Sequence, residues 1–159
     1  MLPGESNGDA LTETGRRQAK AVGAELSSAA HHAVVLSSRA PHARETTAII
    51  ADGLGVSAPE DRGELDGPED SNHEVAMENA WAIIERAKRE LEPDATLVMV
   101  THEVNVRLLI CRALGIPLTE MHRFALNPGS TSTIEWRTQP RERLLIASLN
   151  EVCHLEALA

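Results

Sequence analysis

Histidine and serine side chains that could carry chemistry follow two short apolar runs of this chain. Residues 96–100 predict a buried strand, and His102 lies just beyond its C-terminal end. Ser37 and Ser38 follow a second apolar run, residues 33–36. An imidazole transfers protons near neutral pH, because its ordinary pKa lies close to that pH. We therefore predict acid–base or binding chemistry at His102. The alternative is a hydrogen-bonded histidine that only orders a turn.

Alternating helices and strands are expected to position these residues. Apolar residues at helical spacing, with capping residues, predict helices over 13–28, 41–52, 77–91 and 103–114. Gly53 is expected to end the second helix, and the acidic, Gly- and Pro-rich segment 57–72 reads as a loop. Residues 131–136 and 144–149 predict a terminal strand pair. We expect one α/β domain over 1–159, with three αβα layers and a mostly parallel sheet.

The topology of such a sheet brings the polar strand ends together. In parallel sheets, binding sites form beyond the C-terminal ends of the strands. Ser37, Ser38 and His102 all follow strands of the predicted sheet. We therefore expect them to share one crevice.

The charge and composition exclude several classes of partner. The formal charge is −9 and no basic run offsets it, so we expect neither nucleic acid nor an anionic membrane as partner. The two cysteines, Cys111 and Cys153, lack metal or redox spacing, and no His cluster suggests a metal site. No cofactor is predicted. No signal peptide or membrane-spanning run is seen, so we expect a cytoplasmic protein with a small-molecule substrate.

Several ordered motifs resemble those of the histidine phosphatase superfamily, also called the phosphoglycerate mutase-like family. The resemblance covers nearly the whole chain and implies the corresponding α/β fold. It also implies that His102 is the second histidine of the pocket, which contacts the phosphoryl group. The motifs are Gly4-Glu5-Ser6, Leu11-Thr12-Glu13-Thr14-Gly15-Arg16-Arg17-Gln18-Ala19, Ser37-Ser38 with Ala43-Arg44-Glu45-Thr46, Thr101-His102 and Ser148-Leu149-Asn150.

The same resemblance shows departures at the positions that carry phosphoryl chemistry. Family members begin with Arg-His-Gly, whose histidine becomes phosphorylated, whereas this chain has Leu2 and Pro3 before Gly4. His42 stands where a phosphate-binding arginine is expected. A mostly neutral imidazole replaces a fixed charge with two parallel donors. The exchange removes the main phosphate clamp.

Two glutamates are further candidates for catalysis. Glu103 replaces the glycine that usually follows the pocket histidine, where it would repel phosphate and raise the pKa of His102. Alternatively, it only stabilises the N-terminus of the following helix. Glu64 lies where the family carries a proton-donating glutamate, with one residue deleted. It could instead be one of several solvated acids in this loop.

The remaining candidates would line the cleft. Ser6 and Asn7 follow the remnant of the first motif, and Ser38 and Arg39 follow the second strand. We predict these four residues to bind substrate. Arg44 is expected on the surface.

Three functions agree with these residues. The first is a repurposed enzyme in which His102, His42, Glu64 and Glu103 perform isomerisation, dehydration, cyclisation or hydrolysis of a neutral or cationic small molecule. The second is a catalytically dead phosphatase scaffold that binds a ligand or partner. The third is a phosphatase or mutase of the ordinary type, against which Pro3 argues.

The first strand of the fold is expected to be truncated, because the sequence begins almost at the motif that follows it. The family places that strand inside the sheet, so its loss would leave neighbouring edges unpaired. We therefore expect a homodimer or a rearrangement of the terminal strands.

Overall fold

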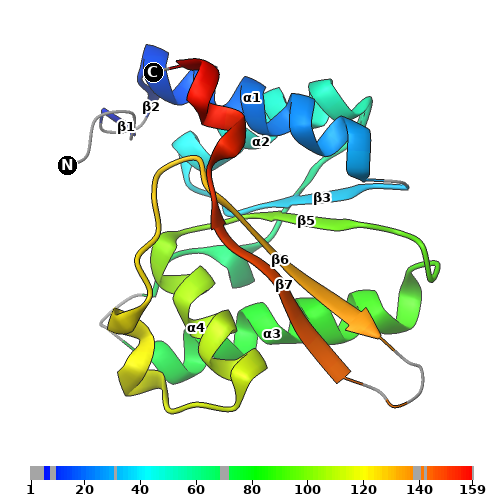
Figure 1. Ribbon diagram of the computed structural model, residues 1–159, viewed down its shortest axis with the longest axis vertical. Helices are drawn as coiled ribbons and strands as arrows, with labels where there is room; N and C mark the ends of the chain where they lie inside the picture. The colour runs from blue at the N-terminus through cyan, green and yellow to red at the C-terminus, as the bar shows by residue number, and fades with distance from the viewer. Residues whose placement is uncertain are drawn as a thin grey trace.

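Two pairs of helices cover the opposite faces of a small parallel sheet (Figure 1). The computed structural model describes residues 6–7, 10–30, 32–68, 72–137, 141 and 143–158. In this view one helix pair lies above strands β3 and β5 and the other lies below them. The predicted three-layer α/β architecture is thus confirmed. The upper pair is α1 (Glu13–Ala29) with α2 (Pro41–Leu54), and the lower pair is α3 (His73–Glu90) with α4 (Glu103–Leu114).

The parallel sheet aligns the ends of its strands. Its order is β4 (Glu60–Asp61), β3 (Val34–Ser37), β5 (Leu97–Val100), and both pairings are parallel. Ser37 pairs with Val100, so the chain leaves both strands at the same edge. This register brings the segment after β3 next to the segment after β5.

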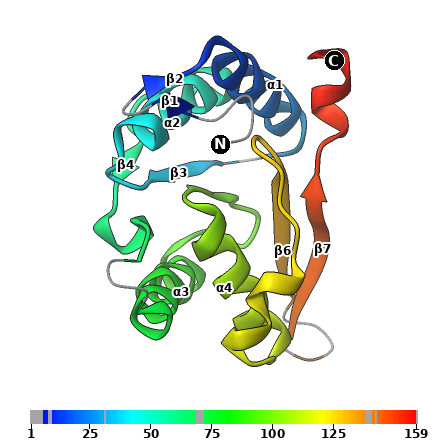
Figure 2. The same cartoon turned by 90° about the vertical axis from the view of Figure 1, so that its left-hand side faces the viewer.

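Two antiparallel pairs complete the strands. The predicted terminal pair is present as β6 (Thr131–Arg137) and β7 (Arg143–Glu151), which run beside the helical layers in Figure 2. A short pair joins β1 (Ser6–Asn7) to β2 (Ala10–Leu11). The expected truncation of the first strand concerns residues 1–5, which lie outside the described residues. Two further 3₁₀ segments are η3 (Leu118–Arg123) and η4 (Cys153–Leu158).

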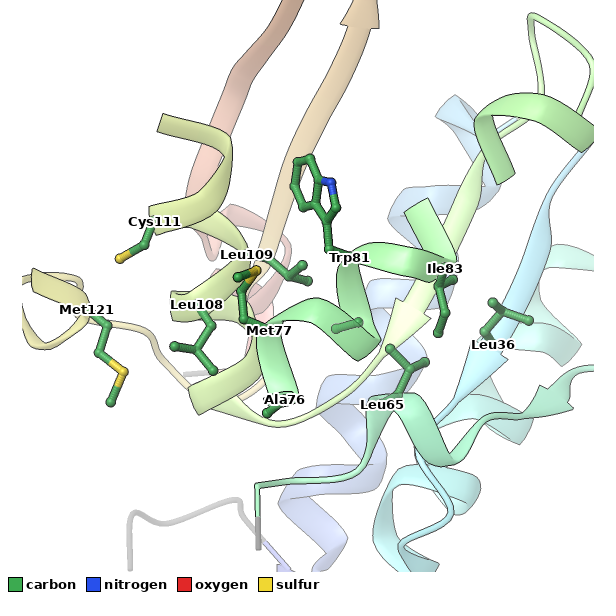
Figure 3. Close-up of a cluster of buried hydrophobic side chains, with 11 residues drawn as sticks. Leu36, Leu65, Ala76, Met77, Trp81, Ile83, Leu108, Leu109, Cys111 and Met121 are labelled. Carbon is green, nitrogen blue, oxygen red and sulfur yellow. The ribbon is translucent and has the colours of Figure 1, made fainter. Parts of the chain in front are cut away.

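The core between the sheet and the lower helix pair is mainly aliphatic. Leu65 and Leu108 are fully buried, and Trp81 of α3 has only 9% of its surface exposed. Figure 3 shows these side chains converging from α3, α4, β3 and the segment before residue 66. Burial of such side chains supplies most of the driving force for folding. This packing fixes the positions of β5 and α4, which carry the candidate site.

Two expectations about helix ends and loops were wrong. Helix α2 continues through Gly53 and ends at Leu54, with Gly55 in the left-handed conformation at φ 68°. A Cβ atom on Gly53 would lie 3.2 Å from the Cα of Gly23, so this glycine permits close approach of α1 and α2. The predicted loop 57–72 also contains β4 and a 3₁₀ turn, η1 (Gly63–Leu65).

None of the helices in the described ranges has the combination of length and apolar character that a bilayer crossing requires.

Candidate active site

His102 occupies the junction between β5 and α4. It is the N-cap residue of α4, with extended backbone angles of φ −98° and ψ 152°. The next strand over, β3, ends at Ser37, and the hydroxyl of Ser38 lies 2.8 Å from Nε2 of His102. The structure therefore brings together these two predicted site residues.

A carboxylate that the sequence analysis did not single out joins this pair. The hydroxyl of Ser38 donates to Oδ1 of Asp66 over 3.0 Å. The backbone N–H of Arg39 donates to the same oxygen over 2.7 Å, and its Nε donates to Oδ2 over 2.7 Å. Desolvation opposes the ionisation of Asp66, but the hydrogen bonds from Arg39 and Ser38 outweigh it and hold its pKa below 3.8. Asp66 is thus ionised near neutral pH.

His42 contributes a second imidazole. Its ring centroid lies 5.5 Å from that of His102, and the two rings are nearly perpendicular at 82°. Burial lowers the pKa of His102 below its ordinary value of 6.5, and His42 lowers it further, whereas Asp66 opposes the shift. The expectation that Glu103 raises this pKa was wrong, since burial dominates. His102 is therefore mostly neutral at pH 7.

The loop that carries Asp66 is fixed by the start of α4. Thr101 donates its hydroxyl to the carbonyl of Leu65 over 2.6 Å. The side-chain amide of Asn105, which is fully buried, donates to the carbonyls of Leu65 and Asp66 at 2.9 Å each. A Cβ atom on Gly67 would lie 3.7 Å from Cγ and Cδ2 of His102, so a side chain at this position would touch the imidazole ring.

The two glutamates predicted to be catalytic lie in ion pairs with arginines. Glu64 faces α3, with Oε1 3.8 Å from a terminal nitrogen of Arg86. Glu103 forms an ion pair with Arg107 one turn further along α4. The position of Glu103 agrees with the alternative of a glutamate in the first helical turn. Glu64 was predicted because the motif suggested it, but the carboxylate that reaches Ser38 belongs to Asp66, two residues later.

The arginines near this edge of the sheet are paired with acids. Arg39 contacts Asp66 at 2.7 Å, and Arg44 contacts Asp61 at 2.8 Å. The side chain of Arg44 is about half exposed, in agreement with its predicted surface position. The guanidinium groups thus contribute little net positive charge to the site. The predicted roles of Ser6 and Asn7 concern side chains that lie outside the described part of the structure.

A metal ion in a protein is held by several His, Cys, Asp or Glu side chains that converge on one point. Across residues 6–7, 10–30, 32–68, 72–137, 141 and 143–158, no three His, Cys, Asp or Glu side chains are grouped so as to hold a metal ion.

The fold has well-matched neighbours among solved structures. A mycobacterial glucosyl-3-phosphoglycerate phosphatase bound to VO3 is 14% identical, with TM-score 0.77 over 89% of this chain and 87% of its own. A phosphoserine phosphatase from Entamoeba histolytica with 3-phosphoglyceric acid is 20% identical, with TM-score 0.73 over 92% and 86%. YhfR from Bacillus stearothermophilus is 21% identical, with TM-score 0.76 over 92% and 87%. At these identities the matches establish the fold.

The sequence itself establishes the family. No curated protein matches the sequence of this chain. The family model of the histidine phosphatase superfamily (branch 1) matches residues 4–66 and 57–148. These ranges cover most of the chain, including the segments that carry Ser38, Asp66 and His102. The protein therefore belongs to the histidine phosphatase superfamily.

Proposed function

We propose that this protein is an enzyme that moves protons on a small organic molecule, with His102 as its acid–base group. The observation that carries the proposal is the neutral imidazole of His102, held by Ser38 at the C-terminal edge of the sheet. A positioned imidazole that is neutral at working pH accepts a proton readily and returns it later in the reaction. Isomerisation, dehydration, cyclisation and hydrolysis all use such a group.

The charges around His102 support a neutral or cationic substrate. Phosphoryl transfer needs a nucleophile and positive charge around the transferred oxygens. The resemblance places Pro3 at the nucleophile position and His42 at an arginine position. Arg39 and Arg44 are both engaged by carboxylates, which would compete with a phosphate for them. We therefore place His42 beside His102 as a substrate-contacting imidazole rather than as an anion clamp.

Phosphomonoester hydrolysis is the second candidate. It is favoured by the neighbours in the fold comparison, two of which are named as phosphatases of phosphoserine and of glucosyl-3-phosphoglycerate. In this case a ligand would have to draw Arg39 away from Asp66, and a group other than Pro3 would have to accept or activate the phosphoryl group.

Two chromogenic substrates separate these candidates. Hydrolysis of p-nitrophenyl acetate and of p-nitrophenyl phosphate is measured for the wild-type protein and for His102→Gln. His122→Gln is the matched control, because His122 is an exposed histidine on η3. The proposal predicts ester hydrolysis that falls about 10²-fold or more in His102→Gln, the usual contribution of general acid–base catalysis, and that His122→Gln retains.

The other outcomes are equally decisive. Phosphate hydrolysis that depends on His102 would favour the second candidate. If folded wild-type protein hydrolyses neither substrate faster than His102→Gln, hydrolysis by His102 is rejected, and a protein that acts by binding is favoured.

We also propose that the protein forms a homodimer. Among the strands that the structure describes, β5 lies at one end of the order of the parallel sheet, and its four residues are partly exposed. A hydrophobic edge strand readily pairs with another chain. Sedimentation equilibrium across a hundredfold range of concentration tests this proposal, and a monomeric mass throughout would reject it.

A further inference from the structure

We infer that Asp66 positions the base of this site by acting through the hydroxyl of Ser38, which fixes the proton of His102 on Nε2 and leaves Nδ1 as the reactive nitrogen. The catalytic consequence rests on the proposed function. The hydrogen-bond arrangement itself does not, so the two can be tested separately.

Counting the protons around Ser38 determines the direction of each hydrogen bond. Among the described residues the hydroxyl oxygen has three polar neighbours: Oδ1 of Asp66 at 3.0 Å, Nε2 of His102 at 2.8 Å and the backbone N–H of Ala40 at 3.2 Å. An ionised carboxylate only accepts, and a backbone N–H only donates. The single hydroxyl proton therefore goes to Asp66. The oxygen can then only accept from His102, which must carry its proton on Nε2.

Burial makes this arrangement hard to replace. Ser38 has no exposed surface, so a broken hydrogen bond there is not readily made good by bulk water. Arg39 holds both oxygens of Asp66 from the other side, through its backbone N–H and its Nε. The carboxylate is thus held with one oxygen directed at Ser38, and the opposite tautomer of His102 would take the hydroxyl proton away from it.

The other side of the imidazole ring is the side available for chemistry. Gly67 faces Cγ and Cδ2, where a Cβ atom on it would lie 3.7 Å away, and Ser38 occupies Nε2. Within the described part of the chain, Nδ1 has no hydrogen-bond partner, and His102 is partly exposed. A neutral imidazole protonated on Nε2 has its lone pair on Nδ1. Nδ1 is therefore the atom that takes the proton from substrate, and the positive charge formed on the ring is stabilised through Ser38 by Asp66.

The tautomer can be measured directly by NMR. Ring ¹⁵N shifts from long-range ¹H–¹⁵N spectra distinguish protonated from unprotonated ring nitrogens for His102, assigned by its loss in His102→Gln. We expect wild-type protein above pH 7 to show a protonated Nε2 and an unprotonated Nδ1. In Asp66→Ala the hydroxyl of Ser38 loses its acceptor and donates to Nε2 instead, so the proton moves to Nδ1. The pKa of His102 should fall at the same time, because Asp66 opposes its depression.

Asp61→Ala is the matched control. Asp61 is a partly exposed carboxylate that pairs with Arg44 much as Asp66 pairs with Arg39, but it lies on β4. This variant should keep the wild-type tautomer. A protonated Nδ1 in the wild-type protein would overturn the inference whether or not Asp66→Ala folds. An unchanged tautomer in folded Asp66→Ala would overturn it as well.

Activity then separates this inference from the proposed function. With p-nitrophenyl acetate as the probe, Asp66→Ala should lower kcat about tenfold or more while KM changes little, because the base is misdirected rather than removed. A tautomer change with no effect on ester hydrolysis would support the hydrogen-bond relay and contradict catalysis by His102. If hydrolysis depends on His102 but His102 carries its proton on Nδ1, catalysis by His102 is supported and the hydrogen-bond relay is wrong.

Discussion

The side-chain amide of Asn105 lies 2.9 Å from the backbone carbonyl of Asp66, although 39 residues separate the two along the chain. Asn105 belongs to the first turns of α4, directly after His102. The loop that carries the carboxylate is therefore attached to the helix that His102 caps.

Replacing Asn105 should destabilise the protein. In Asn105→Leu the carbonyl of Asp66 loses its side-chain donor, whereas the carbonyl of Leu65 keeps the hydroxyl of Thr101. Each buried polar group left without a partner costs about 1–3 kcal/mol. We expect a loss in this range or above it, measured by urea unfolding. Thr101→Val removes only one donor to Leu65, which Asn105 still satisfies, so it should cost less. Equal losses would contradict the assigned role of Asn105.

The depressed pKa of His102 should make stability depend on pH. The unfolded chain binds a proton at this histidine near pH 6.5, whereas the folded protein binds it only at lower pH. The stabilisation that neutral His102 contributes is therefore complete above pH 6.5. It is lost as the pH falls from 6.5 toward the lower pKa of His102 in the folded protein. Comparing unfolding free energies at pH 7.5 and 5.5 for wild-type and His102→Gln isolates this effect. The wild-type protein should lose more stability than the variant.

Asp66 should act in a separate, more acidic window. Its pKa in the folded protein lies below 3.8, so the ionised form contributes stability that is complete above 3.8 and is lost as the pH falls through the folded value. In Asp66→Ala the free energy of unfolding should depend less on pH than in the wild-type protein, and only below about pH 4, the ordinary range of an Asp carboxyl. A weaker dependence on pH near pH 6 in this variant would mean that Asp66 and His102 titrate together.

Gly129 should tolerate no side chain. Its φ is +75°, and a Cβ atom would lie 3.0 Å from Cβ of Gln18 in α1. Gly115 has a similar φ of +66° but open space around the Cβ position. Gly115→Ala should cost about 1–2 kcal/mol for the left-handed backbone, and Gly129→Ala should cost more because the contact is added. Thermal unfolding of both variants compares their losses of stability. A larger loss in Gly115→Ala than in Gly129→Ala would contradict the prediction.

Core packing predicts a large contrast between two leucines of α4. Leu108 is fully buried, whereas Leu114 has half of its surface exposed. Leu108→Ala should lower the free energy of unfolding by about 2–5 kcal/mol, because it leaves a cavity in the core. Leu114→Ala should cost less than about 1 kcal/mol. Denaturant unfolding of the two variants provides the comparison, and similar losses would show that Leu108 is not a core residue.

The sequence predicted the architecture well, because apolar spacing and strand ends depend on local patterns. The helix that begins at Glu13 and the terminal strand pair follow from such patterns, and the approach of Ser38 to His102 follows from the parallel order of their strands. The prediction that Gly53 ends α2 was wrong, because this glycine packs against Gly23 within the helix instead of terminating it. Only the tertiary fold brings those two glycines together.

The carboxylate of the site escaped prediction for a related reason. Asp66 lies in an acidic loop where composition favours solvated side chains, and nothing local distinguishes it from Glu64. Its role depends on the backbone N–H of Arg39 and on Ser38, which the fold supplies from another strand. Leu65 is buried between the two acids, and only the fold shows that Glu64 then pairs with Arg86 while Asp66 reaches Ser38.

The pairing of Arg39 and Arg44 with carboxylates also bears on how fast a substrate reaches the site. The whole chain carries a formal charge of −9. Because both guanidinium groups are paired with carboxylates, they add little positive charge at this edge of the sheet to counteract it. Diffusing anions are therefore slowed and diffusing cations are accelerated, and dissolved salt weakens both effects. The sign of the change in kcat/KM with ionic strength thus reports the charge of the true substrate before its structure is known.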